Sequence, residues 1–267
     1  MSTHLIVTGT TWVTPAVRRV RFRSDDLSAF AGSVLTDRYV KIVFPKPGVV
    51  YPEPLDVRAL RGTLPPEQMP DVRTYTALFP DVDAGTLAID FVVHGDEGVA
   101  GPWAARAEPG DTLLVNGPGG GYRPDPDADW HLLVGDESAM PAIAAALDVL
   151  DPAATVRVVL LIEQPGHEPA LPLPANGAVT HVYRSESTDQ GAVVSAVRDL
   201  EWLPGRVHAF VHGEAQETMH GLRPLLLRER GLTRDQLSIS GYWRRGRTED
   251  GFRVWKSELA RAEAEAR

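Results

Sequence analysis

The segment 130-WHLLVGDESAMPAIAAALDVL-150 decides the fold of the second half of the chain. It opens with a continuous apolar run at 130–135, which a polar turn follows. Apolar residues then recur at helical spacing, at Met140, Ile143, Ala144 and Leu147. A buried strand that turns directly into a helix is typical of a parallel sheet, because parallel strands need a crossover between them. We therefore predict that an α/β domain begins here.

Strand-like and helix-like segments alternate through the rest of this half. Strands are predicted at 156–162, 178–183, 207–213 and 237–243, and helices at 191–200 and 215–231. Buried strands that alternate with helices indicate a parallel, doubly wound sheet. We predict such a domain over residues 130–267, ending in a solvated helix at 257–267.

The first 117 residues contain short runs in which polar and apolar residues alternate, separated by Gly, Pro and Asp. The runs lie at 4–9, 17–23, 39–44, 86–93 and 111–117. This regular spacing predicts a closed antiparallel β-barrel over residues 1–120, so the fold class is a two-domain β + α/β protein. We also expect a short helix at 99–107, a proline-rich loop at 45–72 and an interdomain linker at 116–130.

The chain has 267 residues, with 27 Lys and Arg against 36 Asp and Glu, and no cysteine. The net charge of −9 argues against a general nucleic-acid or membrane-surface binder, which needs a positive field. The lack of cysteine excludes disulfides, cysteine-held iron–sulfur clusters and thiol catalysis. No signal peptide is visible, and no apolar stretch reaches the roughly 20 residues that span a bilayer. We expect a cytoplasmic monomer.

Two motifs in the first half have the composition of a flavin site. In "RTYT", residues 73–76, Arg73 and Tyr75 share one face of a strand and offer a flavin a cation and an aromatic ring. In "DFVVHGDEGVAGPW", residues 90–103, a strand leads through glycines into a short helix whose free N–H groups suit a pyrophosphate. The alternative for both motifs is structural, since an Arg–Tyr pair also serves cross-strand packing.

Two turns at strand ends in the second half are candidate nucleotide sites. "GDESAM" at 135–140 and "HGEA" at 212–215 each follow a strand and precede a helix. Ligands of parallel sheets bind at such carboxyl ends. The first turn lacks the Gly-x-Gly-x-x-Gly pattern, so its position favours a nicotinamide nucleotide more than its sequence does. The alternative is that Asp136 or Ser138 caps the following helix.

Glu163 and Arg184 follow the second and third strands of the predicted sheet. An acidic residue there can hydrogen-bond a ribose and disfavour a 2′-phosphate, whereas a cation favours that phosphate. The two side chains indicate opposite choices, so the sequence leaves both NADH and NADPH open. The eight histidines are scattered without metal-ligand spacing, and no protein-held metal is expected.

The segment "GYWRRGR", residues 241–247, places three arginines beside two aromatic residues in an otherwise acidic chain. We predict that these cations form a local positive pocket for a bulky anionic ligand. The alternative is that they solvate a loop and pair with the acidic residues at 249–250.

Together these motifs resemble the siderophore-interacting protein family of FAD-dependent ferric-siderophore reductases, a branch of the ferredoxin-reductase-like flavoproteins. "RTYT", "DFVVHGDEG", "GPWAARAEPGD", "GDESAMPAI", "HGEA" and "GYWRRG" occur in the family's order along nearly the whole chain. The resemblance implies a flavin-binding barrel and an NAD(P)H-binding domain. It also implies that electrons from NADPH, NADH or a ferredoxin reduce siderophore-bound Fe(III) to Fe(II).

The resemblance further implies which residues bind. The isoalloxazine and ribityl region would be held by Arg73, Thr74, Tyr75 and Thr76. The flavin and its phosphates would be lined by Asp90, Val92, His94, Ala100, Gly101, Trp103 and Ala104. The nicotinamide nucleotide would be framed by Gly135, Asp136, Glu137, Ser138, Ala139, Gly213 and Glu214. Close to the flavin would lie Tyr242 and Trp243. The positive pocket for the substrate is a separate prediction from the charge pattern, and its residues are Lys41, Arg244, Arg245 and Arg247. No catalytic residue is assigned.

One position departs from the family pattern. The barrel motif usually continues to a second arginine two residues after the threonine, and here that position is Leu78. Losing one charge-assisted hydrogen bond costs about 1.5–3 kcal/mol, which predicts roughly ten- to a hundredfold weaker FAD binding. A siderophore-binding protein that has lost FAD therefore stays open as an alternative. A general NAD(P)H–flavin electron-transfer reductase without a siderophore role also stays open.

Overall fold

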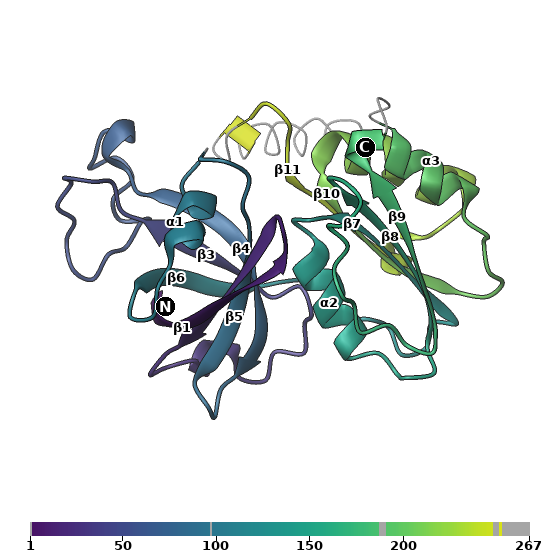
Figure 1. The fold of residues 1–267 in the computed structure, drawn as a ribbon, viewed down its shortest axis with the longest axis horizontal. Helices are drawn as coiled ribbons and strands as arrows, with labels where there is room; N and C mark the ends of the chain where they lie inside the picture. The colour runs from purple at the N-terminus through teal and green to yellow at the C-terminus, as the bar shows by residue number, and fades with distance from the viewer. Residues whose placement is uncertain (1, 97, 187–190, 248–250, 253–267) are drawn as a thin grey trace. The chain divides into compact units, whose positions relative to one another are not determined.

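The computed structural model describes residues 2–96, 98–186, 191–247 and 251–252 (Figure 1). The predicted helix at 257–267 and the acidic residues at 249–250 lie outside this range. The structure forms two compact units, one built mainly from residues 1–123 and the other mainly from residue 124 onward. Each unit is described by itself. Within the described part of the chain, no helix is long and apolar enough to cross a membrane.

The first unit is a closed antiparallel barrel of six strands in the order β1-β2-β5-β4-β3-β6, as predicted. The strands are β1 (Ser2–Thr14), β2 (Val17–Arg23), β3 (Tyr39–Phe44), β4 (Asp71–Asp81), β5 (Thr86–Val92) and β6 (Thr112–Gly119). Its helices are η1 (Ser28–Phe30), η2 (Pro66–Gln68) and α1 (Ala100–Arg106). The proline-rich loop predicted at 45–72 is confirmed as far as residue 70, where β4 follows, and η2 is the one regular helix within it.

The barrel core follows from the alternation of its strands. Inward-facing apolar side chains of neighbouring strands, such as Phe22 and Phe91, are fully buried. Helix α1 adds Trp103, whose ring is stacked on Phe22 at 6.4 Å between centroids and lies 5.6 Å from Phe91. An aromatic cluster under α1 therefore stabilises this side of the barrel.

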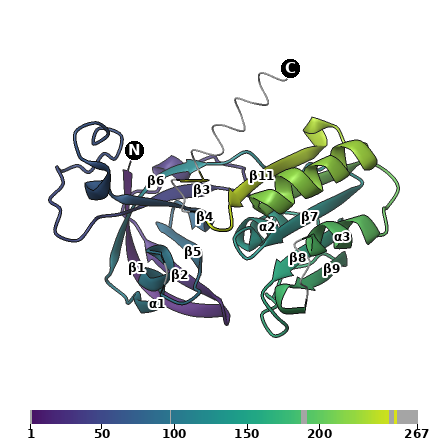
Figure 2. The same cartoon turned by 90° about the horizontal axis from the view of Figure 1, so that it is seen from above.

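The second unit contains a five-stranded sheet in the order β11-β10-β7-β8-β9, with every neighbouring pair parallel (Figure 2). Its strands are β7 (Trp130–Asp136), β8 (Thr155–Ile162), β9 (Asn176–Tyr183), β10 (Val207–Glu214) and β11 (Leu237–Trp243). The helices are α2 (Met140–Asp148), η3 (Arg184–Glu186), α3 (Ala192–Asp199), η4 (Glu217–Leu222), η5 (Leu225–Glu229) and η6 (Arg234–Gln236). The parallel α/β fold is confirmed.

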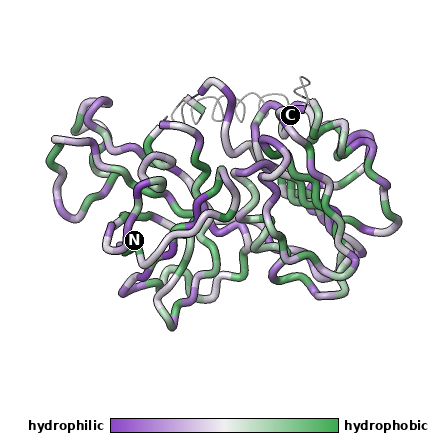
Figure 3. The backbone as a smooth tube through the Cα atoms, viewed as in Figure 1, coloured by the Kyte–Doolittle hydropathy of each residue, from purple (hydrophilic) through white to green (hydrophobic). Residues whose placement is uncertain are grey.

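The central strands β7 and β8 are buried and largely apolar, and green predominates in this part of the tube in Figure 3. Helix α3 and the η4–η5 segment pack on one face around a core that includes Trp130, Val159 and Leu226. If the five strands are numbered along the chain with β7 as the first, their order across the sheet, read from β9 to β11, is third, second, first, fourth, fifth. Consecutive strands therefore diverge between β7 and β10, and open parallel sheets bind ligands at such a switch point, beyond the carboxyl ends of the strands.

The structure changes the predicted end of β6 and the winding of one predicted helix. Strand β6 continues to Gly119, so it occupies the first part of the predicted linker at 116–130. The predicted helix at 215–231 forms, but η4 and η5 within it are wide π-type turns. The backbone N–H of Arg230 accordingly donates to the carbonyl of Leu225, five residues earlier. Hydrophobic periodicity detects a helix but does not resolve this difference in winding.

Candidate functional site

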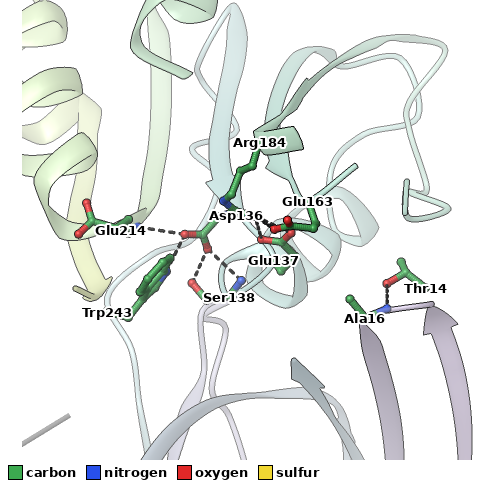
Figure 4. A network of polar contacts seen from close by, with 9 residues as sticks. All are labelled: Thr14, Ala16, Asp136, Glu137, Ser138, Glu163, Arg184, Glu214 and Trp243. Carbon is green, nitrogen blue, oxygen red and sulfur yellow. Dashed lines mark hydrogen bonds and ion pairs between the residues drawn. The ribbon is translucent and has the colours of Figure 1, made fainter. Parts of the chain in front are cut away.

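Asp136, the last residue of β7, joins three strand ends of the second unit (Figure 4). Its side chain is only 3% exposed. Oδ1 accepts hydrogen bonds from the backbone N–H and the hydroxyl of Ser138. Oδ2 accepts the backbone N–H of Glu214 at 3.0 Å and the indole Nε1–H of Trp243 at 2.7 Å. One carboxylate therefore links β7 to the carboxyl ends of β10 and β11.

Glycines allow these strand ends to approach so closely. Gly213 has φ +155°, and a Cβ there would lie 2.8 Å from Asp136 Oδ2. A Cβ on Gly135 would lie 2.6 Å from the Cβ of Ala139, which begins the following helix as its N-cap. The glycines of the two nucleotide-type turns thus serve packing around Asp136. No side chain caps α2, so the predicted cap by Asp136 or Ser138 is wrong, because Asp136 binds the turn before the helix.

Glu214, the last residue of β10, holds two further segments. Its Oε2 accepts the backbone N–H groups of Gln216 and Glu217 at the start of the helical segment. Its Oε1 accepts the backbone N–H of Arg245 at 3.1 Å, just beyond β11. The side chain is buried. Asp136 and Glu214 together therefore fix the backbone of the "GYWRR" segment against the sheet.

A small pocket lies at the switch point, and its lining includes Gly135, Asp136, Gly213, Glu214, Glu217 and Thr218. Burial, reinforced by the carboxylates of Glu214 and Asp136, raises the pKa of Glu217 to about 7. Three carboxylates around one small space disfavour a phosphate inside it. Glu217 is not among the residues predicted from the sequence, although it follows Glu214 by three residues at the start of a predicted helix.

Arg184, directly after β9, forms an ion cluster with two glutamates from the neighbouring strand ends (Figure 4). Its Nη1 donates to both carboxylate oxygens of Glu137, at 2.7 and 2.8 Å. The nearer oxygen of Glu163 is 3.9 Å away. Burial raises the pKa of Glu137, and Arg184 opposes that shift. Burial works to lower the pKa of Arg184, but Glu137 outweighs it and the pKa is raised.

The barrel places Arg73 and Tyr75 on β4 as predicted, two residues apart and both half-buried. Arg73 lies 3.8 Å from Asp71, a carboxylate that Lys46 also contacts at 2.5 Å. The Tyr75 ring is 4.7 Å from Phe91. Thr76 is buried, whereas Thr74 is exposed and accepts a hydrogen bond from Lys41 at 3.3 Å. A cation and an aromatic ring on one strand face fit the needs of a flavin.

The other predicted flavin residues include several with structural partners. Asp90 is 6% exposed, and both its oxygens accept hydrogen bonds from Arg19 on β2, at 2.7 and 2.8 Å. Ala100, Ala104 and Trp103 pack against the barrel core. Strand β5 ends at Val92, one residue before the end of the predicted run at 86–93, and His94 is exposed. A cofactor contact by any of these residues stays a prediction.

Packing explains the residue type at two positions of the barrel, one glycine and one leucine. A Cβ on Gly101 would lie 3.1 Å from the carbonyl oxygen of Val92, so α1 approaches β5 closely there. Leu78 is fully buried, and its strand partner is Ala88. The position that carries an arginine in the family pattern is therefore filled here by an apolar side chain in apolar surroundings.

The arginines of the "GYWRRGR" segment differ in exposure. Arg244 is half-buried, whereas Arg245 and Arg247 are exposed. The Tyr242 ring lies 4.7 Å from the ring of His212 on β10, which in turn stacks on Phe210.

Among the described residues, no group of three or more His, Cys, Asp and Glu side chains is arranged to hold a metal ion.

Two family descriptions match this chain in succession. A siderophore-interacting FAD-binding domain matches residues 6–122, and a siderophore-interacting protein domain matches residues 128–246. The ferric vibriobactin reductase ViuB of Vibrio cholerae is 31% identical over 248 residues, which cover 90% of this chain and 89% of ViuB. The chain belongs to the siderophore-interacting protein family.

Other members and relatives agree with this placement. The crystal structure of a siderophore utilization protein from T. fusca superposes with a TM-score of 0.76 and 34% identity, covering 93% of this chain and 94% of that one. The NADPH-dependent ferric-chelate reductase of Escherichia coli is 35% identical over 139 residues, 52% of this chain and 53% of the reductase. The family domain that matches the barrel segment is described as FAD-binding, and the relatives of this chain include ferric reductases.

Proposed function

We infer that this protein is an FAD-dependent reductase that passes electrons from NADH or NADPH to the Fe(III) of a ferric siderophore. The observation that carries the proposal is the face of β4 that bears Arg73 and Tyr75, in the segment that matches the FAD-binding domain of the family. The ferric vibriobactin reductase among its relatives supports the iron substrate. One NAD(P)H would reduce two Fe(III) to two Fe(II), releasing NAD(P)⁺ and one proton.

The barrel residues would hold the cofactor. Arg73 would offer a cation and Tyr75 an aromatic ring from one face of the strand, whereas the side chains of Thr74 and Thr76 lie on its other face. When bound, FAD supplies a carrier that accepts two electrons as a hydride and releases them singly. The protein contributes placement and electrostatics, so no side chain is assigned as acid or base. Asp90, held by Arg19, would stabilise the two strands beneath this surface.

The second unit would bind the nicotinamide nucleotide that donates the electrons, and it would provide the surface that binds the substrate. The ends of β7, β8 and β9 would receive a nicotinamide nucleotide, as parallel sheets of this order do. Asp136 and Glu214 would set the position of Trp243 and Arg245 through the bonds described above. Arg245 and Arg247 would attract an anionic ferric complex, because both side chains are exposed.

A steady-state assay tests this proposal. The FAD-loaded protein is mixed with NADH or NADPH and a ferric tris-catecholate, and Fe(II) is captured by ferrozine. We expect nucleotide-dependent Fe(II) release at twice the rate of nucleotide oxidation. Rapid reduction of free flavin without Fe(II) release would indicate a general flavin reductase. A colourless protein that takes up no FAD but binds the ferric complex would indicate a siderophore-binding protein, and turnover with reduced ferredoxin alone would indicate a different donor.

The role of the basic segment has its own control. We expect the double substitution Arg245→Ala, Arg247→Ala to raise the KM for the ferric tris-catecholate while the KM for a neutral quinone stays unchanged. Arg234→Ala serves as the matched control, because Arg234 is an exposed arginine that precedes β11 and so lies at the amino end of the strands. Equal changes for both acceptors would contradict a cationic substrate surface.

A further inference from the structure

The ion cluster of Glu137, Glu163 and Arg184 occupies the carboxyl ends of three adjacent strands. Glu137 follows β7, Glu163 follows β8 and Arg184 follows β9. The backbone N–H of Ser185 donates to the carbonyl of Glu163, so the two strand ends are also joined through the main chain. With two carboxylates and one guanidinium, the cluster has a formal charge of −1.

Arg184 is committed to one of these carboxylates. Its contacts to both oxygens of Glu137 are 2.7 and 2.8 Å, and the two side chains are 20% and 12% exposed. Turning Arg184 toward a ligand would leave the Glu137 carboxylate buried without its cation, which is strongly unfavourable. Glu163 differs, since its side chain is 58% exposed and 3.9 Å from Arg184. The group that faces solvent at the end of β8 is thus a carboxylate.

The end of the second strand is where a sheet of this order receives the adenosine ribose of a dinucleotide. A carboxylate there accepts hydrogen bonds from free ribose hydroxyl groups, whereas a 2′-phosphate brings about two negative charges beside it. We propose that Glu163, with Arg184 held by Glu137, makes this protein select NADH over NADPH. The inference rests on the proposed function of the second unit, and it gives this chain the opposite donor to the one in the name of the E. coli relative.

Binding of the oxidised nucleotides tests the selection without turnover. NAD⁺ and NADP⁺ are titrated into the purified full-length protein by calorimetry. We expect NAD⁺ to bind at least about tenfold more tightly, the order expected when a phosphate lies within a Debye length of one carboxylate. Glu163→Gln should reduce this ratio about five- to tenfold by strengthening NADP⁺ binding. Glu137→Gln should also strengthen NADP⁺ binding, because it releases Arg184.

Glu201→Gln is the matched control. Glu201 is an exposed glutamate that precedes β10, so it lies at the amino ends of the strands, whereas Glu163 lies at their carboxyl ends. Glu201→Gln should leave the ratio unchanged. Tighter NADP⁺ binding by the unsubstituted protein, or a ratio that Glu163→Gln does not change, would overturn the selection and leave the reductase proposal standing. Binding of neither nucleotide would overturn both the selection and the NAD(P)H part of the proposed function. Selective NAD⁺ binding without ferric reduction would support the selection and contradict the reductase proposal.

Discussion

Loss of Asp136 should destabilise the second unit strongly, because this carboxylate joins three strand ends. Its two carboxylate oxygens accept four hydrogen bonds from Ser138, Glu214 and Trp243, and the side chain is 3% exposed. Asp136→Ala removes the acceptor and leaves a buried donor, the N–H of Glu214, and the partly buried donors of Ser138 and Trp243 without it. Trp243→Phe removes the indole N–H together with part of the ring system and keeps a smaller aromatic ring in place. The two substitutions and their combination form a double-mutant cycle.

The expected magnitudes follow from the bonds removed. A buried donor without a partner costs about 1–3 kcal/mol, and at least the N–H of Glu214 and the indole of Trp243 lose theirs in Asp136→Ala. We therefore expect that substitution to lower the free energy of unfolding by about 3–5 kcal/mol. Trp243→Phe removes one hydrogen bond to a charged group, so we expect about 1.5–3 kcal/mol. The double variant should be less destabilised than the sum of the two by about 1.5–3 kcal/mol.

Native-state hydrogen exchange followed by mass spectrometry is the suitable assay, because the two units can open separately and a single melting curve would mix them. Peptides that cover β7, β10 and β11 report the opening free energy of the sheet, and peptides of the barrel serve as the internal control. Additive effects of the two substitutions, within about 0.5 kcal/mol, would refute a direct bond between Asp136 and Trp243. A loss below about 1 kcal/mol in Asp136→Ala would refute its role in joining the strand ends.

Three further predictions concern other residues. The raised pKa of Glu217, about 7 against an ordinary 4.5, means that its stabilising contribution is complete below pH 4.5 and is lost as pH rises toward 7. Denaturant titration measures the free energy of unfolding of Glu217→Gln and of the unsubstituted protein. Allowing for the partial exposure of Glu217, we expect the difference between them to change by about 1–2 kcal/mol in favour of Glu217→Gln between pH 5 and pH 7.5. A difference that stays constant with pH would contradict the raised pKa. Asp90→Ala should destabilise the barrel by about 3–5 kcal/mol, because it leaves Arg19 without its paired carboxylate, and Arg19→Ala with Asp90→Ala should restore part of the loss. Gly213→Ala should lower the melting temperature by several degrees, because φ +155° and the contact with Asp136 both oppose a Cβ; no change would show that the strand end can shift.

The sequence predicts the fold well where a short segment specifies its own structure. The run 130–150 is a strand and a helix because its apolar periodicity changes at the polar turn, and α1 is visible as a short helical piece between two strands. The barrel strands follow from alternation, which buries one face. The end of β6 was misplaced because "NGPGG" is typical of a linker, yet it pairs with β3 as far as Gly119.

The sequence predicts less of the candidate site, because its contacts join distant parts of the chain. Glu137 and Arg184 are 47 residues apart, and Asp136 and Trp243 are 107 apart. In the sequence, Glu163 favours NADH and Arg184 favours NADPH, because nothing in the sequence shows that Arg184 is paired with Glu137. The sequence predicts where the motifs lie. The pairing of carboxylates with cations depends on the order of the strands in the sheet, which the sequence alone does not give.

The central claim, that electrons pass from flavin to siderophore-bound iron on this protein, is tested most directly by a single turnover. The FAD-loaded protein is photoreduced without nucleotide, mixed anaerobically with a ferric tris-catecholate in the presence of ferrozine, and followed at the flavin and Fe(II)–ferrozine absorbance bands. The proposed function predicts that the flavin band returns while two Fe(II) form per flavin, faster than with an equal concentration of free reduced FAD. A flavin that stays reduced, or Fe(II) formation no faster than with free reduced FAD, would contradict it.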